Sequence, residues 1–178
     1  MSPEPVDQVL LRHVIVVGGS LAEWASLTDD QWSTRLAELG KVADHVGAQW
    51  LILRPYGPDG TAHAVPEHSV MVGNCLVVAQ PDTDGRRRLA RAIAGLQQRG
   101  APISEATIDA EMNAPAEHDP DLVVVLAASH RMPPSLVWEL AYSELVFVDS
   151  PWQHFAAQQL DEAMASYAHR HRRFGGVD

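Results

Sequence analysis

Arginines near the C-terminus are the side chains of this sequence best suited to phosphate chemistry. The chain ends R-H-R-R-F-G-G-V-D, where Arg173 precedes Gly175 and Gly176. A guanidinium fork matches phosphate oxygens, and a glycine lets a backbone N–H approach a ligand closely. On local grounds the same residues are typical of a helix that ends in a glycine cap. The tail, residues 171–178, therefore carries two interpretations.

Other polar groups could bind anions or metals, but their local patterns favour solvent exposure. Arg54 ends a predicted strand, where a solvated side chain is expected. Nine histidines are scattered without the spacing of a zinc site. A predicted solvated basic face of one helix carries Arg86, Arg87, Arg88 and Arg91.

Length and composition indicate one globular domain, residues 1–178, with a flexible start over residues 1–11. The chain has 178 residues, 46% of them apolar, and a formal net charge of -10, which argues against nucleic-acid binding. A single cysteine, Cys75, is typical of a reducing compartment. No apolar run reaches the ~18 residues of a membrane span, and the first residues do not form a signal peptide. These features together predict a cytoplasmic protein.

Continuous apolar runs predict buried strands over residues 13–17, 50–53, 75–79, 122–128 and 145–148, with a further short strand at 69–72. Helical patterns follow over residues 29–46, 85–99 and 152–170, with short helices after Ser104 and after Ser135. Strands that alternate with helices predict an α/β fold with a mainly parallel central sheet flanked by helices. Ligands of such sheets bind at the carboxyl ends of strands, which here are Gly18-Gly19 and residues 125–131.

Residues 136–155 read L-V-W-E-L-A-Y-S-E-L-V-F-V-D-S-P-W-Q-H-F. This stretch resembles the cis-prenyltransferase family, the relatives of undecaprenyl diphosphate synthase, and the R-R-F-G-G ending resembles theirs. The resemblance implies the fold of that family. In catalytic members, long helices after the second strand line a hydrophobic tunnel for the growing prenyl chain. Here only the short segment 61–72 stands in their place, so we expect the fold to be truncated in the tunnel helices.

Aligned with the family, the strand-end site has lost most of its charged groups. The magnesium-binding aspartate falls on Gly19, and the arginine before the tryptophan falls on Glu23. At the second strand end, a diphosphate-binding arginine falls on Val125 and a phosphate-binding serine on Pro133. Arg131 matches a retained substrate-binding arginine. We expect no turnover by this chain alone, because the lost groups act together in positioning and charge neutralisation.

Glu144 matches the family's second magnesium carboxylate. Its alternative role is a salt bridge at an interface or at a helix end. With the aspartate replaced by Gly19, the sequence favours the salt bridge, and no metal site of this chain is assigned.

The tail matches a family motif, R-x-G, at Arg173-Phe174-Gly175, with Gly176 after it. In the family this motif crosses the dimer interface and completes the diphosphate site of the partner. The sequence is similar to the non-catalytic subunit of heteromeric members such as the Nogo-B receptor pair. The resemblance implies a heterodimer or heterotetramer with a catalytic homologue, whose site would hold Mg²⁺ and isoprenoid diphosphates, with peripheral membrane contact through that partner. The expected interface residues are Trp138, Tyr142, Glu144, Phe147 and Trp152.

Two alternatives remain at this point. One is a self-contained prenyl-diphosphate enzyme of altered chemistry, performing short-chain prenyl coupling or terpene formation on the same fold. The other is a homodimeric binding or scaffold protein. Turnover by the isolated chain would favour the first of these, and a full-length homologue encoded by a neighbouring gene would favour the heteromeric subunit.

Overall fold

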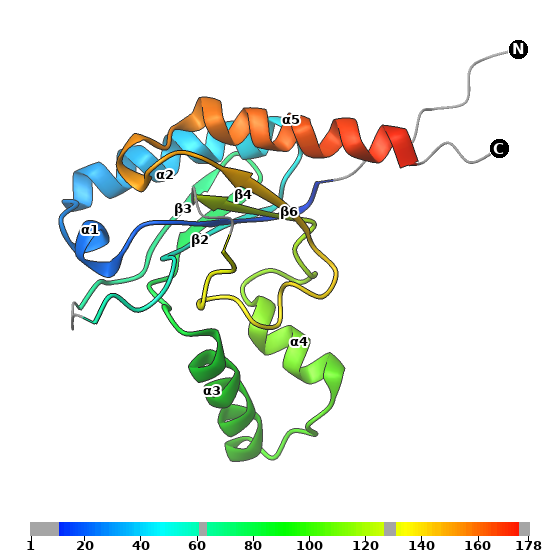
Figure 1. Ribbon diagram of the computed structural model, residues 1–178. Helices are drawn as coiled ribbons and strands as arrows, with labels where there is room; N and C mark the ends of the chain where they lie inside the picture. Colours follow the sequence, from blue (N-terminus) through cyan, green and yellow to red (C-terminus); the bar gives the residue numbers. More distant parts are fainter. Residues whose placement is uncertain (1–10, 61–63, 127–130, 175–178) are drawn as a thin grey trace, which may run out of the picture.

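The computed structural model describes residues 11–60, 64–126 and 131–174, with side chains up to Arg170, and these residues form one six-stranded sheet (Figure 1). The strands lie in the order β3-β4-β2-β1-β5-β6. β3 pairs antiparallel with β4, while the other neighbours pair in parallel, so the predicted mainly parallel sheet is confirmed. The bounds are β1 His13–Val17, β2 Trp50–Arg54, β3 His68–Val72, β4 Cys75–Ala79, β5 Leu122–Leu126 and β6 Glu144–Val148.

Helices cover the two faces of the sheet (Figure 1). α2 and α5 lie side by side over one face, whereas α3 and α4 pack against each other on the opposite side. The short α1 follows the carboxyl end of β1, and a 3-10 turn, η1, precedes α5. The bounds are α1 Leu21–Ala25, α2 Asp29–His45, α3 Gly85–Gln98, α4 Glu105–Asn113, η1 Trp152–His154 and α5 Ala157–Phe174.

Side-chain caps set the beginnings of α1 to α4. The Thr28 hydroxyl accepts from the backbone N–H of Gln31, whose side chain in turn accepts from the N–H of Thr28. Ser20 and Ser104 form the same reciprocal cap on α1 and α4, and Asp84 caps α3. Each such cap stabilises a helix by about 1 kcal/mol. The predicted helix starts at residues 29 and 85 are therefore confirmed.

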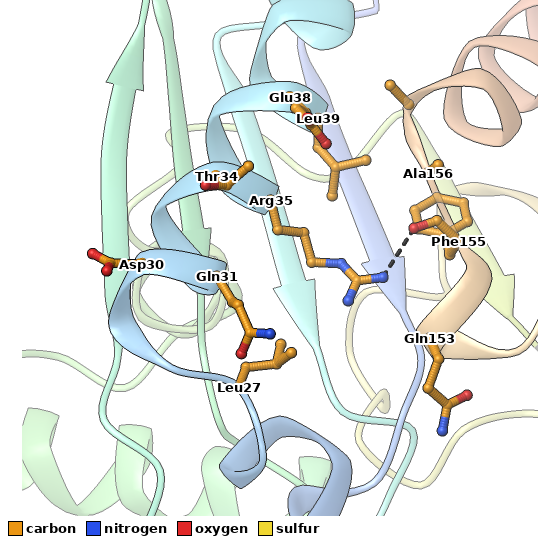
Figure 2. Close-up of a pocket in the computed structure, with 11 residues that line it drawn as sticks. Leu27, Asp30, Gln31, Thr34, Arg35, Glu38, Leu39, Gln153, Phe155 and Ala156 are labelled. Atoms are coloured by element: carbon orange, nitrogen blue, oxygen red, sulfur yellow. Dashed lines mark hydrogen bonds between the residues drawn. The ribbon is translucent and has the colours of Figure 1, made fainter.

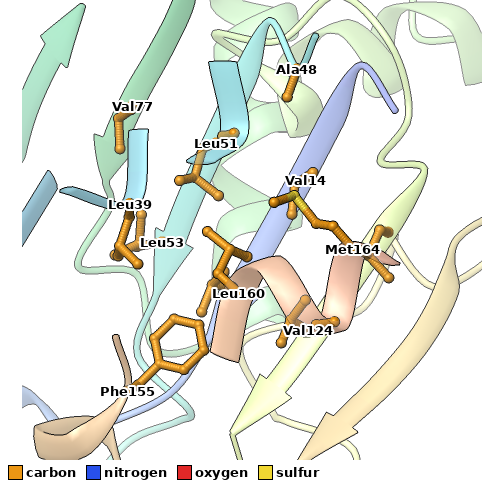
Figure 3. Close-up of a cluster of buried hydrophobic side chains, with 14 of the residues drawn as sticks. Val14, Leu39, Ala48, Leu51, Leu53, Val77, Val124, Phe155, Leu160 and Met164 are labelled. Atoms are coloured by element: carbon orange, nitrogen blue, oxygen red, sulfur yellow. The ribbon is translucent and has the colours of Figure 1, made fainter. Parts of the chain in front are cut away.

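Apolar side chains fill the space between the sheet and the pair formed by α2 and α5. Figure 3 shows Val14, Leu51 and Val124 of the strands together with Leu160 and Met164 of α5. All five are at most 2% exposed. Leu136, from the segment after β5, packs on the opposite face of the sheet. The strands are thus covered on both sides, which explains their continuous apolar runs.

Two of the predicted helices differ in the structure. The short helix expected after Ser135 is wrong: residues 135–141 form turns, because the Glu139 carboxylate binds two distant arginines and so short a helix has little stability of its own. The final helix begins at Ala157 rather than at Trp152. Arg35 donates to the carbonyl oxygens of Trp152 and Phe155, which a longer helix would have to use itself.

The connection from β2 to β3 is short, as the sequence predicted. Residues 55–67 join the two strands, and the described part of this connection contains no helix. α2 lies directly against the neighbouring strands, since a Cβ added at Gly40 would come within 2.6 Å of Val72 Cγ2 and 2.7 Å of Val77 Cγ2. Among the described residues, no helix is both long and apolar enough to cross a membrane.

Candidate functional site at the strand ends

The carboxyl ends of β1 and β5 lie next to each other, because the two strands pair in parallel with Val17 opposite Val125. β1 continues into Gly18 and Gly19 before α1 begins. β5 continues into residues 127–130, which lie outside the described residues, and the chain is described again from Arg131. This edge of the sheet is where a parallel α/β fold binds ligands.

Two stacked indole rings close the position of Gly19. The backbone of Gly19 has φ +75, and a Cβ placed there would lie 2.7 Å from Trp152 Cγ and 2.9 Å from Trp24 Nε1. The two indoles stack with ring centroids 5.3 Å apart, and Trp24 Nε1 donates to the carbonyl oxygen of Gly18 at 3.0 Å. Any side chain at residue 19 would therefore have to displace the stack.

Glu23 is held by its own helix. Its carboxylate accepts from the backbone N–H of Ser20 at 2.7 Å and its N–H donates to the Ser20 hydroxyl at 3.2 Å. The Gln153 side-chain amide donates to the second carboxylate oxygen. The carboxylate thus joins α1 to the segment before α5, and its negative charge would repel an anion at this edge.

At the second strand end, two described residues that align with diphosphate-binding positions, Val125 and Pro133, carry no charge. Val125 is fully buried in the apolar cluster on the α3 side of the sheet. Pro133 is buried, and its carbonyl oxygen accepts from the N–H of Leu136 at 3.0 Å. The side chain of Arg131 is exposed, while its carbonyl oxygen accepts from the Tyr56 hydroxyl at 2.9 Å. Arg131 is therefore placed at this edge with its guanidinium accessible to a ligand.

Glu144 lies at the amino ends of the strands, away from Gly19 and Arg131 at the carboxyl ends. It is the first residue of β6, a strand of 5 residues that spans about 13 Å. Its carboxylate accepts from Arg170 Nη1 of α5 at 3.1 Å. This is the helix-end salt bridge that the sequence offered as the alternative to a metal ligand. The structure does not bring Glu144 together with Gly19 or Arg131 within one chain.

The residues of this chain do not fit the magnesium site of the family. Gly19 supplies no carboxylate, and Glu144 lies at the amino ends of the strands. Within the described ranges, no group of three or more His, Cys, Asp or Glu side chains could hold a metal ion.

The tail begins at the end of α5. Arg173 belongs to the last turn of this helix, which ends at Phe174 and extends beyond the sheet (Figure 1). Gly175 and Gly176 lie outside the described residues. Because α5 returns across the sheet after β6, its end lies on the side of the amino ends of the strands, as the Arg170–Glu144 pair confirms. Arg173 thus lies toward the amino ends of the strands, whereas Gly19 and Arg131 lie at the carboxyl ends.

The five expected interface residues fall into different environments. Trp152 is only 3% exposed, belongs to the core of the chain and packs on Trp24, which leaves little of its surface for a partner. Trp138 is half-buried and its indole N–H donates to Asp109 of α4. Phe147 is half-buried against the apolar cluster on the α3 side. Tyr142 is 78% exposed, which leaves it accessible to a partner.

Two arginines that the sequence placed in solvent are buried around one carboxylate. Arg54 is 1% exposed and Arg88 is 8% exposed, and both form ion pairs with the same oxygen of Glu139. Burial lowers the pKa of Arg54 to about 10 and the pKa of Arg88 to about 9. The one available sequence signal was Glu139 itself, a charged residue within the apolar run of residues 136–141.

A third arginine, Arg35, lines a pocket of about 410 Å³ between α2 and the segment that precedes α5 (Figure 2). Its guanidinium lies 4.0 Å from the centre of the Trp152 ring and donates to the Phe155 carbonyl oxygen at 2.9 Å. Burial lowers the pKa of Arg35. These contacts hold Trp152 in place. Arg35 thereby keeps the Trp152 ring packed over Gly19.

Comparison with known proteins agrees with the architecture. A family profile described as "Putative undecaprenyl diphosphate synthase" matches residues 69–175. Isoprenyl transferase 2 of Bradyrhizobium diazoefficiens is 41% identical over 91 residues, which are 51% of this chain and 36% of that protein. The ditrans,polycis-undecaprenyl-diphosphate synthase of Lactiplantibacillus plantarum is 40% identical over 96 residues, which are 52% of this chain and 37% of that protein.

Solved structures of the same class share the fold. The crystal structure of lavandulyl diphosphate synthase from Lavandula x intermedia in complex with dimethylallyl diphosphate superposes with a TM-score of 0.65 at 17% identity, over 91% of this chain and 97% of that one. A probable undecaprenyl diphosphate synthase from Campylobacter jejuni gives 0.58 at 12% identity, over 89% and 95% of the two chains.

Fold and sequence therefore define an α/β protein of the cis-prenyltransferase class. The chain belongs to the undecaprenyl diphosphate synthase family of prenyltransferases. The matched region spans little more than a third of the length of the curated relatives, 36% and 37% for the two named above.

Proposed function

We propose that this chain is a non-catalytic subunit of a heteromeric cis-prenyltransferase. It pairs with a catalytic homologue and completes that partner's diphosphate site through Arg173 and the backbone near Gly175 and Gly176. The observation that carries the proposal is the separation of Arg173 from the strand-end site of its own chain. Arg173 lies toward the amino ends of the strands, and Gly19 and Arg131 lie at the carboxyl ends.

The closed strand end of the chain supports a non-catalytic role. Where catalytic relatives hold a carboxylate for magnesium, Gly19 is covered by the indoles of Trp24 and Trp152. Glu23 carries a negative charge, and Val125 is a fully buried apolar side chain, at positions that align with arginines of the family. Transfer from a diphosphate depends on neutralising the charge of the leaving group, and among the described residues that align with the site Arg131 is the one cationic group, which is too little for turnover.

The position of the tail supports action on a second chain. α5 carries Arg173 away from the strand-end site of its own chain, so a diphosphate that it contacts has to belong to a partner. A guanidinium in contact with a buried diphosphate contributes ~1.5–3 kcal/mol. If that contact strengthens in the transition state, it corresponds to roughly one to two orders of magnitude in rate. Magnesium would then be held by carboxylates of the partner.

The decisive experiment is co-expression with a full-length homologue from the same genome. The tagged chain is used to isolate the partner, and the complex, the partner and the chain are each assayed for prenyl-diphosphate synthesis. The proposal predicts co-purification and a rate for the complex well above that of the partner alone. A partner that reaches its full rate without this chain would overturn it.

A second candidate is a self-contained enzyme of altered prenyl chemistry. The names of the sequence relatives favour it, since these proteins are called isoprenyl transferases. In that case the accessible Arg131 would bind the substrate, and the isolated chain would turn over without any partner. Assays of the isolated chain with allylic diphosphates as the sole substrates separate the two candidates.

A further inference from the structure

A pocket lies between α3, α4 and the carboxyl ends of β2 and β4, on the face of the sheet opposite α2 and α5. Its volume is about 270 Å³, just below the ~300 Å³ at which pockets for drug-sized ligands begin. Its cationic lining consists of Arg54, Arg88, Arg91 and Arg99, and its anionic lining of Asp82 and Glu111. A pocket of this size suits a ligand of a few heavy atoms rather than a prenyl chain.

The inner end of the pocket carries an uncompensated positive charge. Arg54 and Arg88 both pair with the Oε1 atom of Glu139, and the three side chains are 1%, 10% and 0% exposed. Two guanidinium groups therefore share one carboxylate, which leaves one net positive charge. A buried charge without a partner is costly, because little water reaches it.

Hydrogen bonding at Arg88 is also incomplete. Its Nε atom is buried without a hydrogen-bond partner among the described residues. Its Nη1 atom donates to the carbonyl oxygen of Ser135 at 3.4 Å, a long contact. The Arg54 guanidinium donates to Gln80 Oε1 at 3.1 and 3.3 Å, and the Gln80 amide donates onward to Ala114, so Arg54 is held in position. Unused donors at a buried guanidinium call for an acceptor.

The outer end of the pocket is neutral. Arg91 pairs with Asp82 and Arg99 pairs with Glu111, and both arginines are more than half exposed. The pocket as a whole, with Glu139 included, thus keeps one net positive charge in a chain of net charge -10. Arg86 and Arg87 of the same helix do not line the pocket and are exposed, so the cationic lining is specific to one face of α3.

We propose that this pocket binds a small oxyanion of the phosphate type, either a free phosphate or diphosphate or the headgroup of a phosphorylated metabolite. The oxyanion would neutralise the excess charge of the arginine pair and accept from Arg88, while Arg91 and Arg99 bind it from the outer end. Guanidinium groups suit this role because their planar fork matches phosphate oxygens. The site lies on the α3 side of the sheet and does not include Gly19 or Arg131, so it is independent of the function proposed above.

Calorimetric titration of the isolated chain tests the proposal, with inorganic phosphate, pyrophosphate and isopentenyl diphosphate as probes and sodium chloride at matched ionic strength as the blank. Arg91→Gln removes a cationic group and should weaken binding about fivefold, whereas Asp82→Asn removes an anionic one and should tighten it by a similar factor. Arg86→Gln, on the solvent face of the same helix, is the matched control and should leave the affinity unchanged. Circular dichroism verifies that each variant folds.

The outcomes divide clearly. Equal affinity for pyrophosphate and isopentenyl diphosphate would identify a free anion as the ligand, and tighter binding of the latter would identify a headgroup. No heat with any probe at millimolar concentration would overturn the proposal. It would also be overturned if Arg131→Gln abolished binding while Arg91→Gln and Asp82→Asn did not alter it, because the anion would then bind at the strand ends.

Discussion

Trp152 stacks on Trp24 with ring centroids 5.3 Å apart and ring planes inclined by 25°. The two residues come from opposite ends of the chain, and together they cover Gly19, which the sequence aligned with the magnesium-binding aspartate of the family. The Arg35 guanidinium lies over the Trp152 ring, 4.0 Å from the ring centre, and holds the stack from α2. The packing of these two indoles thus leaves no room for a side chain at residue 19.

The isolated chain should make no prenyl product from farnesyl diphosphate, isopentenyl diphosphate and magnesium. Gly19 and Val125 supply neither a cation nor a metal ligand, and the Glu23 carboxylate, already bound by Ser20 and Gln153, adds negative charge where the leaving group would sit. A radiolabel assay of the purified chain checks this. Steady-state turnover above the blank would contradict the prediction and would favour the self-contained enzyme.

Gly19→Asp should destabilise the fold and create no activity. The new Cβ would overlap Trp152 and Trp24, and overpacking of this kind costs ~1–3 kcal/mol beyond the strain of a positive φ. Gly47→Asp is the matched control, because Gly47 also has a positive φ, +86, but has nothing within 4 Å of an added Cβ. Urea unfolding of both variants isolates the packing effect. An equal loss of stability in the two variants would contradict the prediction, because the two indoles would then move aside without a cost in folding free energy.

Arg173→Ala should slow the reconstituted complex by roughly one to two orders of magnitude while leaving it assembled. The guanidinium is expected to contact the partner's diphosphate and not the interface itself. Arg170→Ala is the control on the same helix, since it loses only an exposed pair with Glu144, worth about 0–1 kcal/mol. Turnover is measured beside size-exclusion chromatography. A full rate for the Arg173 variant would reduce this chain to a scaffold.

Glu139→Gln should lower the free energy of unfolding by ~3–5 kcal/mol, because it leaves Arg54 and Arg88 buried without a counter-charge. Glu111→Gln removes an ion pair of the same kind at an exposed position, where the loss should be about 0–1 kcal/mol. Denaturant titrations of the two variants give the comparison. Similar losses would mean that water already reaches the buried pair.

Acidification should destabilise the protein through His13. This residue is 0% exposed, its Nδ1 hydrogen-bonds the carbonyl oxygen of His118 at 2.7 Å, and burial lowers its pKa from 6.5 to about 4. Between these two values the unfolded chain binds a proton that the folded chain does not. Stability is therefore complete above pH ~6.5 and falls as the pH is lowered toward 4.

The expected loss through His13 between about pH 7.5 and about pH 5 is about 2 kcal/mol. His13→Asn keeps a donor near His118 but does not titrate, so its stability should vary less over this interval. Urea unfolding at the two pH values measures the difference. An identical pH dependence in the wild-type chain and the variant would place the titrating group elsewhere.

Local sequence determined the elements of this fold well. Cys75–Ala79 was predicted with its observed bounds because five consecutive apolar residues, bordered by turn residues, suit a strand that is buried on both faces. Ser104 identified a helix start because its cap involves a residue only three positions away. The sequence placed Gly18 and Gly19 at the carboxyl end of the first strand, and β1 does end at Val17, directly before them.

The tertiary structure alone decided the environment of the charged and aromatic side chains. Arg54 read as a solvated strand end, yet it is buried against Glu139, a residue 85 positions away. Trp152 read as an interface residue, yet it closes the position of Gly19. The sequence resemblance assigned Glu144 and Gly19 to two ligand positions of one metal site, yet Glu144 lies at the amino end of β6 and Gly19 follows the carboxyl end of β1. A local pattern encodes backbone conformation, because hydrogen bonds and caps join near neighbours. The partner of a long polar or aromatic side chain is chosen by packing between distant segments, which only the folded chain brings together.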